Sequence, residues 1–392
     1  MKAAIITYSN CPNEDAGAVR QHSFAKAFKS IGFEVLEVGM GYTKQYEIYE
    51  YDDSKYVSLR NEISKNRGSF EYLFEHKKKL KFLLETQLKY CKFDVIMFRG
   101  LPYNTLQYLK RYARKNDTVL IYDCVEWYSP QQFKKGRFDL LYIQQNMYNK
   151  VWIDRPIRVI AISNYLYKNF QSKGIEVVYI PVIMDIKEIQ YEKTKIANKL
   201  ILLYAGQPGK KDYLKEVIEG LLLLTKHEQE KVELRIIGTT QNQLIENTGL
   251  TVEQINILRN SISIIGRVKR EEVLNQLSTA DFTVLLRSTT QRYAKAGFPT
   301  KVVESLASGT PVMLNLTSDL GNYIHDMKEG IIIEDCTSDA FAVAIRKALS
   351  LNRNELISMQ KNARDSAVKN FDYIHYVNEL KILLSKGREV YK

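Results

Sequence analysis

The segment of residues 296–312, AGFPTKVVESLASGTPV, places a glycine, a proline and one carboxylate around the expected start of a helix. Gly297 frees the backbone, Pro299 suits a first helical turn because its missing N–H is not needed there, and Thr300 can cap. The N–H groups at a helix start form a ready site for a diphosphate. Glu304, about one turn further on, could accept both hydroxyls of a ribose. The simpler alternative is an ordinary loop and helix with a surface glutamate.

A second segment, residues 204–212 with the sequence YAGQPGKKD, also follows an expected strand and precedes an expected helix. Gly206 and Gly209 let the backbone approach a ligand, and Lys210 and Lys211 can neutralise phosphate oxygens. The spacing does not match a Walker loop. A solvated loop is the alternative interpretation.

In the first half of the chain, Gly17 forms a small-residue turn before a helix, where backbone N–H groups could meet a phosphate, and Arg20 follows it. Asp123, Glu126 and Trp127 follow an expected buried strand in the sequence YDCVEWY. The two carboxylates could bind acceptor hydroxyls or help to move a proton, and the indole could stack on a sugar ring. A capping aspartate with a packing tryptophan is the alternative.

Alternating strands and helices position these segments. Apolar positions recurring at helical spacing, separated by short apolar runs, predict parallel sheets with helices on both faces. The expected strands lie at 2–7, 34–38, 95–98, 118–122, 158–162, 177–180, 200–204, 233–237, 261–265, 282–286, 312–314 and 330–333. The main expected helices lie at 18–31, 59–90, 103–115, 137–152, 165–172, 212–225, 271–277, 300–307, 338–349, 353–369 and 373–386.

The restart of this alternation after a linker at 180–198 predicts an α/β protein with two Rossmann-like domains facing across a cleft. The boundaries fall at 1–185 and 186–370, and a final helical stretch occupies 371–392. A chain of 392 residues is long enough for two cores.

The net charge of +12 is compatible with nucleic acid, an anionic membrane or a phosphorylated small molecule as partner, or with a lysine-rich proteome. No nucleic-acid-binding module is recognisable, so we expect no nucleic acid. The four cysteines are widely spaced, and there is no signal-peptide pattern or apolar stretch of about 18 residues, which favours a cytoplasmic protein with reduced thiols. The lysine-rich stretch HKKKLKFLL, residues 76–84, could lie on an anionic membrane at the inner face of the cell membrane, or could be a packed helix with a solvated face.

The C-terminal half resembles glycosyltransferase family 4, a group of retaining transferases with the two-domain GT-B architecture. The resemblance rests on 296–312, on Gly206 with Lys211, and on Gly266 and Arg267 in the sequence IGRV. It implies that Glu304 binds the ribose, that residues Phe298, Pro299 and Thr300 offer N–H groups to the diphosphate, and that Lys211 grips it. It also implies an acceptor-binding first domain, a donor-binding second domain and a last helix that packs back on the first.

The chain departs from that family at Ala296, where a second glutamate is common, and at Gln207, near the place of an arginine. We find no Asp-x-Asp and no His-Glu-x-x-His, so no metal ligands and no metal dependence are expected.

The sequence therefore predicts a metal-independent, hexosyltransferase-like enzyme that needs no cofactor. It would move a sugar from a UDP- or GDP-linked donor to a glycan or lipid-linked saccharide acceptor, in the biosynthesis of a bacterial surface polysaccharide such as capsule or lipopolysaccharide. The alternatives are a nucleotide-sugar 2-epimerase of the same architecture and a non-catalytic scaffold that retains part of a donor site.

Overall fold

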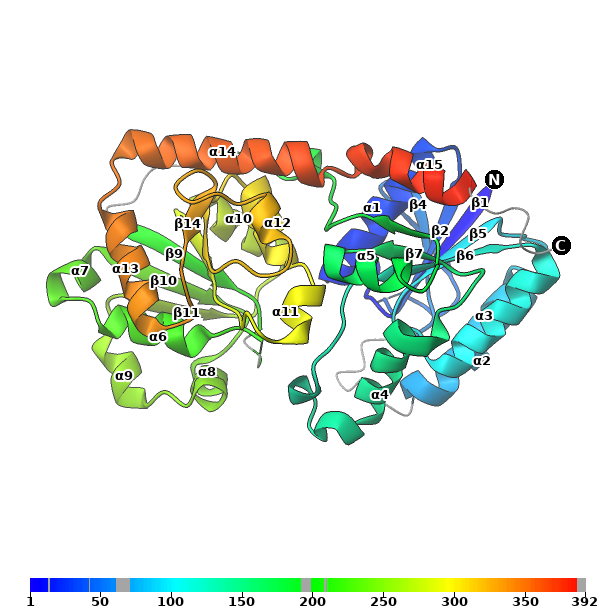
Figure 1. The fold of residues 1–392 in the computed structure, drawn as a ribbon, viewed down its shortest axis with the longest axis horizontal. Helices are drawn as coiled ribbons and strands as arrows, with labels where there is room; N and C mark the ends of the chain where they lie inside the picture. The colour runs from blue at the N-terminus through cyan, green and yellow to red at the C-terminus, as the bar shows by residue number, and fades with distance from the viewer. Residues whose placement is uncertain are drawn as a thin grey trace. The chain divides into compact units, whose positions relative to one another are not determined.

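The computed structural model describes residues 1–12, 15–41, 43–60, 71–191, 199–207, 209 and 211–385. The chain divides into two compact units (Figure 1). Residues 1–185 with 372–392 form one, here called the N-terminal unit, and residues 186–371 form the other, the C-terminal unit. Within the described ranges no helix is both long enough and apolar enough to span a membrane. All four cysteines are free thiols.

The N-terminal unit is built on an eight-stranded sheet in the order β3-β4-β2-β1-β5-β6-β7-β8. Every neighbouring pair is parallel except β3 with β4. The strands are β1 Lys2–Ile6, β2 Glu34–Gly39, β3 Ile48–Tyr51, β4 Ser54–Ser58, β5 Val95–Phe98, β6 Val119–Cys124, β7 Arg158–Ala161 and β8 Val177–Tyr179.

Helices cover both faces of this sheet (Figure 1), as parallel strands buried on both sides require. The α-helices are α1 Ala16–Ser30, α2 His76–Phe82, α3 Tyr103–Asn116, α4 Leu140–Met147, α5 Asn164–Gln171 and α15 Val377–Ser385. Shorter 3₁₀ and π turns are η1 Glu71–Glu75, η2 Leu83–Gln87, η3 Pro130–Gln132, η4 Gly136–Phe138, η5 Tyr148–Trp152 and η8 Tyr373–Tyr376.

The C-terminal unit is built on a six-stranded, all-parallel sheet in the order β11-β10-β9-β12-β13-β14. Its strands are β9 Leu200–Ala205, β10 Val232–Ile237, β11 Ile262–Gly266, β12 Phe282–Leu285, β13 Val312–Leu314 and β14 Gly330–Ile332. Its helices are α6 Leu214–Leu222, α7 Lys226–Glu230, α8 Gln241–Thr248, α9 Val252–Ile257, α10 Arg270–Thr279, α11 Arg292–Ala296, α12 Thr300–Ala307, α13 Ser338–Leu349 and α14 Arg353–Phe371, with 3₁₀ turns η6 Ile186–Glu188 and η7 Leu320–Asn322. The predicted α/β class is confirmed in both units.

The last helix, α15, packs on α1 and β8 within the N-terminal unit. Leu380 and Leu383 are buried in the same apolar core as Phe24 and Phe28 of α1. Arg158 of β7, itself buried, donates to the carbonyl of Leu383 at 2.7 Å. A cation that satisfies carbonyl groups at a helix end stabilises that end.

The structure adds two strands at residues 40–57, where no strand or helix was expected from the sequence. A hairpin, β3 and β4, is formed there and extends the sheet edge beyond β2. Asp52 and Asp53 make its turn with φ of 46° and 58°, values that aspartate tolerates better than most residues. The signal in the sequence was the tyrosine-rich flanks of this Asp-Asp pair, which also contain Ile48 and Val57.

The expected helix over 59–90 is corrected. Strand β4 ends at Ser58, and Leu59 continues extended, donating to the carbonyl of Gly39; residues 61–70 lie outside the described residues. Leu80, Leu83 and Leu84, which could have formed a membrane-lying face, are buried inside the unit. This part of the chain is therefore a packed domain helix, the alternative interpretation of its lysine-rich pattern. The expected helix over 137–152 is likewise split into η4, α4 and η5.

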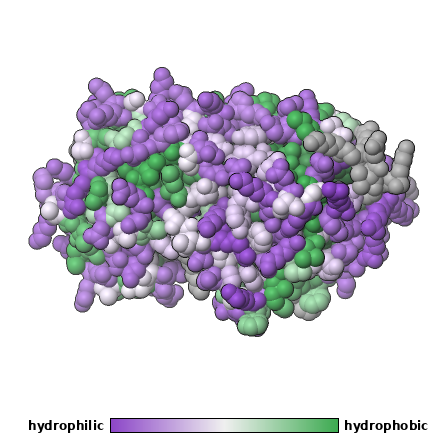
Figure 2. Space-filling model, viewed as in Figure 1, coloured by the Kyte–Doolittle hydropathy of each residue, from purple (hydrophilic) through white to green (hydrophobic). Residues whose placement is uncertain are grey.

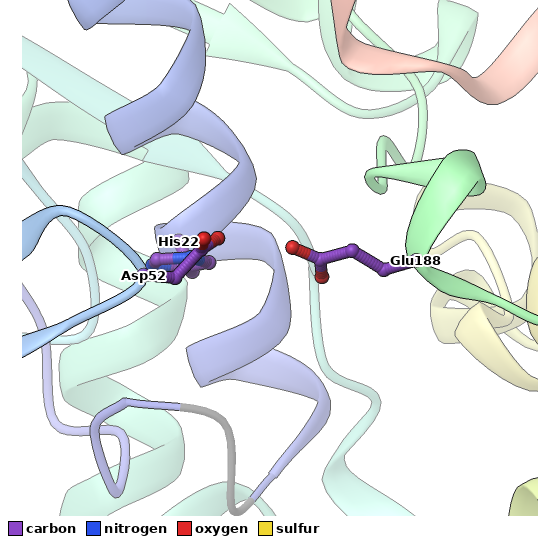
Figure 3. Close-up of side chains that lie close together, drawn as sticks. All are labelled: His22, Asp52 and Glu188. Carbon is purple, nitrogen blue, oxygen red and sulfur yellow. The ribbon is translucent and has the colours of Figure 1, made fainter.

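A charged cluster fastens the hairpin to α1 (Figure 3). The Nδ1 of His22 lies 2.7 Å from the buried carboxylate of Glu37, and its Nε2 lies 3.1 Å from Asp52 in the hairpin turn. Lys26 also pairs with Asp52. When both carboxylates are ionised they only accept hydrogen bonds, so both ring nitrogens then donate and the imidazole carries a positive charge. Glu188, labelled in the same view, belongs to the C-terminal unit.

This cluster predicts a pH-dependent stability. Burial lowers the pKa of His22, but the carboxylates of Glu37 and Asp52 raise it more, so the pKa lies above its ordinary value. The stabilisation by charged His22 is therefore fully present below an unfolded-state pKa of about 6.5 and is lost as pH rises through the folded-state pKa. We expect His22→Gln to cost about 2 kcal/mol below pH 6 and progressively less at higher pH, measured by urea unfolding.

The matched control is His227→Gln, since His227 is exposed on α7. An equal cost of His22→Gln at all pH values between about 5.5 and 8.5 would show that the imidazole does not act through its charge.

Candidate functional site

Three glycines lie at the carboxyl ends of neighbouring strands in the C-terminal unit. Gly206 follows β9, Gly238 follows β10 and Gly266 ends β11, and all three have positive φ, of 141°, 103° and 82°. A Cβ on Gly238 would lie 2.7 Å from the carbonyl atoms of Gly206, so side chains are excluded where these strand ends meet. The carboxyl edge of a parallel sheet is where such folds bind ligands, and these glycines leave its backbone approachable. Sequence reasoning named Gly206 and Gly266 but missed Gly238.

Helix α12 begins beside this edge, at Thr300 as expected. The N-cap is Pro299, which makes no side-chain hydrogen bond to the first turn, so Thr300 is not the cap that we predicted. Gly297 has a φ of −87°, extended backbone that any residue adopts, so no glycine-specific conformation is needed there. Phe298 is buried against the rings of Tyr323 and Phe371. Packing by Phe298 thus fixes the helix start, while the positive end of the helix dipole has no side-chain cap from Pro299.

A buried ion cluster sits under the helix start and was not predicted from the sequence. Asp212 accepts from Lys301 at 2.6 Å and from Arg287 at 2.8 Å, and it also accepts from the hydroxyl of Tyr204 at 2.8 Å. The ammonium of Lys301 lies 4.2 Å from the centre of the Tyr204 ring. A Cβ on Gly206 would lie 2.7 Å from that ammonium, which ends a flexible side chain, so it is the φ of 141° that favours glycine here.

The charged groups in this cluster shift one another's pKa values. Burial raises the pKa of Asp212, but Lys301 and Arg287 lower it more, so the pKa falls well below its usual range and the carboxylate stays ionised. Burial lowers the pKa of Lys301, and the Asp212 carboxylate offsets part of that shift. Two cations and one carboxylate leave a net positive charge at the strand ends, next to the start of α12, which suits an anionic ligand.

The carboxylate of Glu304, one turn into α12, pairs with Arg270 at the start of α10. The Glu304 side chain is 15% exposed, so ligand hydroxyls could still reach it beside the guanidinium. Arg270 was not singled out in the sequence. The ion pair places the guanidinium of Arg270 beside the carboxylate that we expected to bind a ribose. Arg267, which follows β11, is exposed.

Of the predicted lysines, Lys210 lies outside the described residues. Lys211 is half-buried, with its ammonium 5.8 Å from the centre of the Tyr293 ring, and its carbonyl accepts from the Tyr293 hydroxyl at 3.1 Å. Ala296 is completely buried at the end of α11. A methyl group therefore stands where the resembled family commonly has a carboxylate.

In the N-terminal unit, Asp123 at the end of β6 is buried and bound by two guanidinium groups. Arg20 donates to it from Nε and Nη2, at 2.9 Å for the closest contact, and Arg99 donates from Nη1 at 3.2 Å. Arg20 also donates to the carbonyl groups of Ile180 and Pro181. Asp123 is only 1% exposed, which differs from the expected contact with an acceptor; the structure gives it the part of orienting Arg99 and Arg20.

Arg99 and Gly17 meet above this pair. The second nitrogen of the Arg99 guanidinium donates to the carbonyl of Gly17 and to the hydroxyl of Ser9, both at 2.9 Å. Gly17 lies in the first turn of α1, inside the helix rather than before it, because Asp15 caps the helix by accepting from Ala18 N–H.

A cavity of about 390 Å³ opens beside Arg99, at the carboxyl ends of β1, β5 and β6. Its lining combines tyrosine rings, one guanidinium and a few apolar groups: Tyr8, Ser9, Tyr72, Arg99, Gly100, Tyr128, Phe133, Leu141 and Gln145. Negative charge on Glu126 and burial raise the pKa of Tyr128 well above its usual value, so its hydroxyl remains protonated. A volume of this size with aromatic walls and polar tips suits a sugar ring.

Trp127 does not line that cavity. Its indole is 9% exposed and its N–H donates to Asn146 of α4 at 2.9 Å, which agrees with the alternative interpretation of a packing tryptophan. Glu126 is half-buried, and its carbonyl accepts from Asn149.

Three solved structures resemble the whole chain at low sequence identity. Sucrose-phosphate synthase from Thermosynechococcus elongatus matches with a TM-score of 0.73, 15% identity and 98% of each chain covered. HepE from Anabaena, solved with UDP and glucose, matches with a TM-score of 0.69, 16% identity and coverage of 99% of this chain and 100% of that one. The lipopolysaccharide outer core galactosyltransferase WaaB, in its apo form, matches with a TM-score of 0.62, 15% identity and coverage of 99% and 100%.

These likenesses define the fold as GT-B, two Rossmann-like α/β units in one chain, as the sequence predicted. No sequence among the curated proteins matches the chain. Residues 185–366, nearly the whole C-terminal unit, match the family of glycosyl transferases group 1. The C-terminal unit is thus similar to glycosyl transferases of group 1, in agreement with the resemblance of this half of the chain to family 4.

The Asp212 cluster predicts a large effect from removing one charge. Asp212→Asn leaves Lys301, 30% exposed, and Arg287, 16% exposed, without their counter-ion, which should destabilise the C-terminal unit by about 2 kcal/mol. Unfolding should be measured by scanning calorimetry. Tryptophan fluorescence would report on the N-terminal unit instead, because both tryptophans, Trp127 and Trp152, lie there.

The double variant Asp212→Asn/Lys301→Met is the matched comparison, because it also removes one of the two cations and should recover part of the lost stability. If Asp212→Asn unfolded like the native protein, the cluster would contribute nothing to the fold.

Proposed function

We propose that this protein is a retaining, metal-independent hexosyltransferase that moves a sugar from a UDP- or GDP-linked donor to a glycan acceptor. In this proposal the C-terminal unit binds the donor and the N-terminal unit binds the acceptor. The observation that carries it is the convergence, at one sheet edge, of three positive-φ glycines, the start of α12, and the ion pairs of Lys301 and Glu304.

The donor would be held in parts. Its diphosphate would lie at the start of α12, near Gly206 and the ammonium groups of Lys301 and Lys211, and its ribose would be bound by Glu304. Backbone N–H groups from Phe298 to Thr300 and the loop ends at Gly266 and Arg267 would complete the contacts. HepE was solved in complex with UDP and glucose and in complex with UDP-glucose, which supports a nucleotide sugar here.

In the transfer step, the acceptor oxygen bonds to the anomeric carbon while the bond from that carbon to the diphosphate breaks. The departing diphosphate takes the hydroxyl proton, since Asp123 is already bound by two guanidinium groups. The positive charge around Lys301 stabilises the diphosphate as it gains charge. No metal is required in this scheme.

The acceptor would occupy the tyrosine-lined cavity of the N-terminal unit. We propose a growing surface glycan, carried on a lipid at the inner face of the cell membrane, with peripheral contact to the anionic bilayer. The outer-core galactosyltransferase among the structural neighbours supports this class of acceptor.

Donor binding is tested first at Glu304. We expect Glu304→Ala to weaken binding of UDP or GDP by roughly tenfold or more in isothermal calorimetry, since a carboxylate hydrogen bonded to a ribose contributes about 1.5–3 kcal/mol.

The control is Glu253→Ala, which removes an exposed carboxylate from α9 of the same unit and should leave the affinity unchanged. Equal affinities for the native protein and Glu304→Ala would remove the ribose contact from the proposal.

Metal removal gives a second test. Sugar transfer should persist in excess EDTA, because protein cations rather than a divalent ion meet the charge of the diphosphate. Activity that vanishes in EDTA and returns with Mg²⁺ or Mn²⁺ would contradict the metal-free scheme.

Product analysis separates transfer from epimerisation. A transferase releases nucleoside diphosphate in step with a glycosylated acceptor, whereas a 2-epimerase changes the sugar without needing an acceptor. Donor consumption that is independent of a glycan acceptor would favour the epimerase, and unchanged product in Glu304→Ala would favour the non-catalytic scaffold.

A further inference from the structure

The segment from Pro130 to Trp152, which contains η3, η4, α4 and η5 and is here called the α4 segment, exposes apolar side chains. Phe138 is 84% exposed, Leu140 67% and Val151 60%. Ile143 is 41% exposed and lies three residues after Leu140, so both side chains project from one face of α4. Figure 2 shows hydrophobic surface in the area where Figure 1 draws α4. The outer face of this short helix is therefore apolar, the reverse of a normal solvent-facing helix.

The charges of the α4 segment are nearly all positive. Lys134, Lys135, Arg137 and Lys150 are exposed, and Asp139 is the one acidic residue between Pro130 and Trp152. Asp139 is used internally, since its side chain accepts from Leu141 N–H at 3.0 Å to cap α4. Exposed basic groups therefore flank the exposed apolar groups.

The inner face of the same segment is fixed by aromatic packing. Phe133 contacts the rings of Tyr128 and Tyr142, with ring centres 5.6 and 5.7 Å apart. Leu141 and Gln145 form one wall of the tyrosine-lined cavity. The fold therefore does not need the outward apolar side chains, and the segment joins the exposed face to the proposed acceptor cavity.

We propose that the outer face of the α4 segment is a docking surface for an anionic lipid bilayer, and that it brings the tyrosine-lined cavity to the head of a lipid-linked acceptor. The pattern is that of an interfacial element: apolar side chains enter the headgroup region while lysine and arginine contact anionic lipid. This location differs from the 76–84 helix, whose leucines are buried. The inference rests on the proposed function for the identity of the acceptor, while the docking itself is tested separately.

The test is sedimentation of the full chain with vesicles of phosphatidylcholine alone or of equal parts phosphatidylcholine and phosphatidylglycerol. We expect binding to the anionic vesicles. Phe138→Ser/Leu140→Ser should lower the partition coefficient by about tenfold or more, since both side chains lose burial in the bilayer. Lys134→Gln/Lys135→Gln/Arg137→Gln should lower it by about fivefold per residue and should remove most of its salt dependence.

Matched controls lie in the C-terminal unit. Val252→Ser/Ile257→Ser changes two exposed apolar residues of α9, and Lys226→Gln/Lys231→Gln/Lys361→Gln removes the same number of exposed charges. Both controls should bind vesicles like the native chain. All variants should also bind UDP or GDP like the native chain in calorimetry, so a failure of docking is distinct from a failure of the donor site.

Several outcomes would overturn the proposal. The native chain would fail to sediment with anionic vesicles, or would bind neutral vesicles equally well, or the α4-segment variants would bind no more weakly than the controls. A fourth is that the native chain self-associates in ultracentrifugation and Phe138→Ser/Leu140→Ser abolishes this without changing vesicle binding, which would assign the apolar face to a second copy.

Discussion

The ionised carboxylate of Asp212 is the interaction on which the organisation of the C-terminal unit depends. It holds Lys301 of α12 and Arg287 after β12, and it accepts from Tyr204 of β9, so one buried group fastens two strand ends to a helix start. An isolated buried charge is costly, and this one is tolerated because each partner is itself within hydrogen-bond distance. The same pairs leave a surplus of positive charge at the glycine-lined edge, so the contact that orders the edge also gives it the sign that a phosphorylated donor requires.

The N-terminal unit also contains a buried carboxylate that is bound by two cations. Asp123 is enclosed by Arg20 and Arg99, and Arg99 reaches on to Ser9 and Gly17. The carboxyl ends of β1, β5 and β6 are thereby joined around a cavity whose walls are mainly aromatic. The Arg99 guanidinium lines this cavity, and the other lining groups are neutral rings, hydroxyls, an amide and apolar groups. This mostly neutral lining fits a unit that binds a sugar.

The α4 segment connects the exposed apolar and basic face of the N-terminal unit to the tyrosine-lined cavity. Its inner side chains line the cavity and its outer side chains are apolar and basic, so any ligand that reaches the cavity from a bilayer would pass one continuous element. The hairpin at the other edge of the sheet is held instead by the ion pairs of His22 with Glu37 and Asp52, for which we predict a pH-dependent stability. The N-terminal unit therefore combines an apolar core with two peripheral elements. The α4 segment is attached by aromatic packing, and the hairpin is attached by ion pairs.

The sequence by itself determined the alternation of strands and helices, and hence the two parallel sheets, because apolar periodicity and capping residues are local properties. Helices α12 and α13 begin and end where their patterns predict. It also singled out the segments at the carboxyl edge, since Gly206 and Gly266 stand where a strand end needs a positive φ. Tertiary structure alone decided which side chains meet there: Lys301 with Asp212, Glu304 with Arg270, and Asp123 with two arginines are 89, 34 and up to 103 residues apart. Sequence spacing carries no signal for such pairs, because it is the sheet order that brings them together.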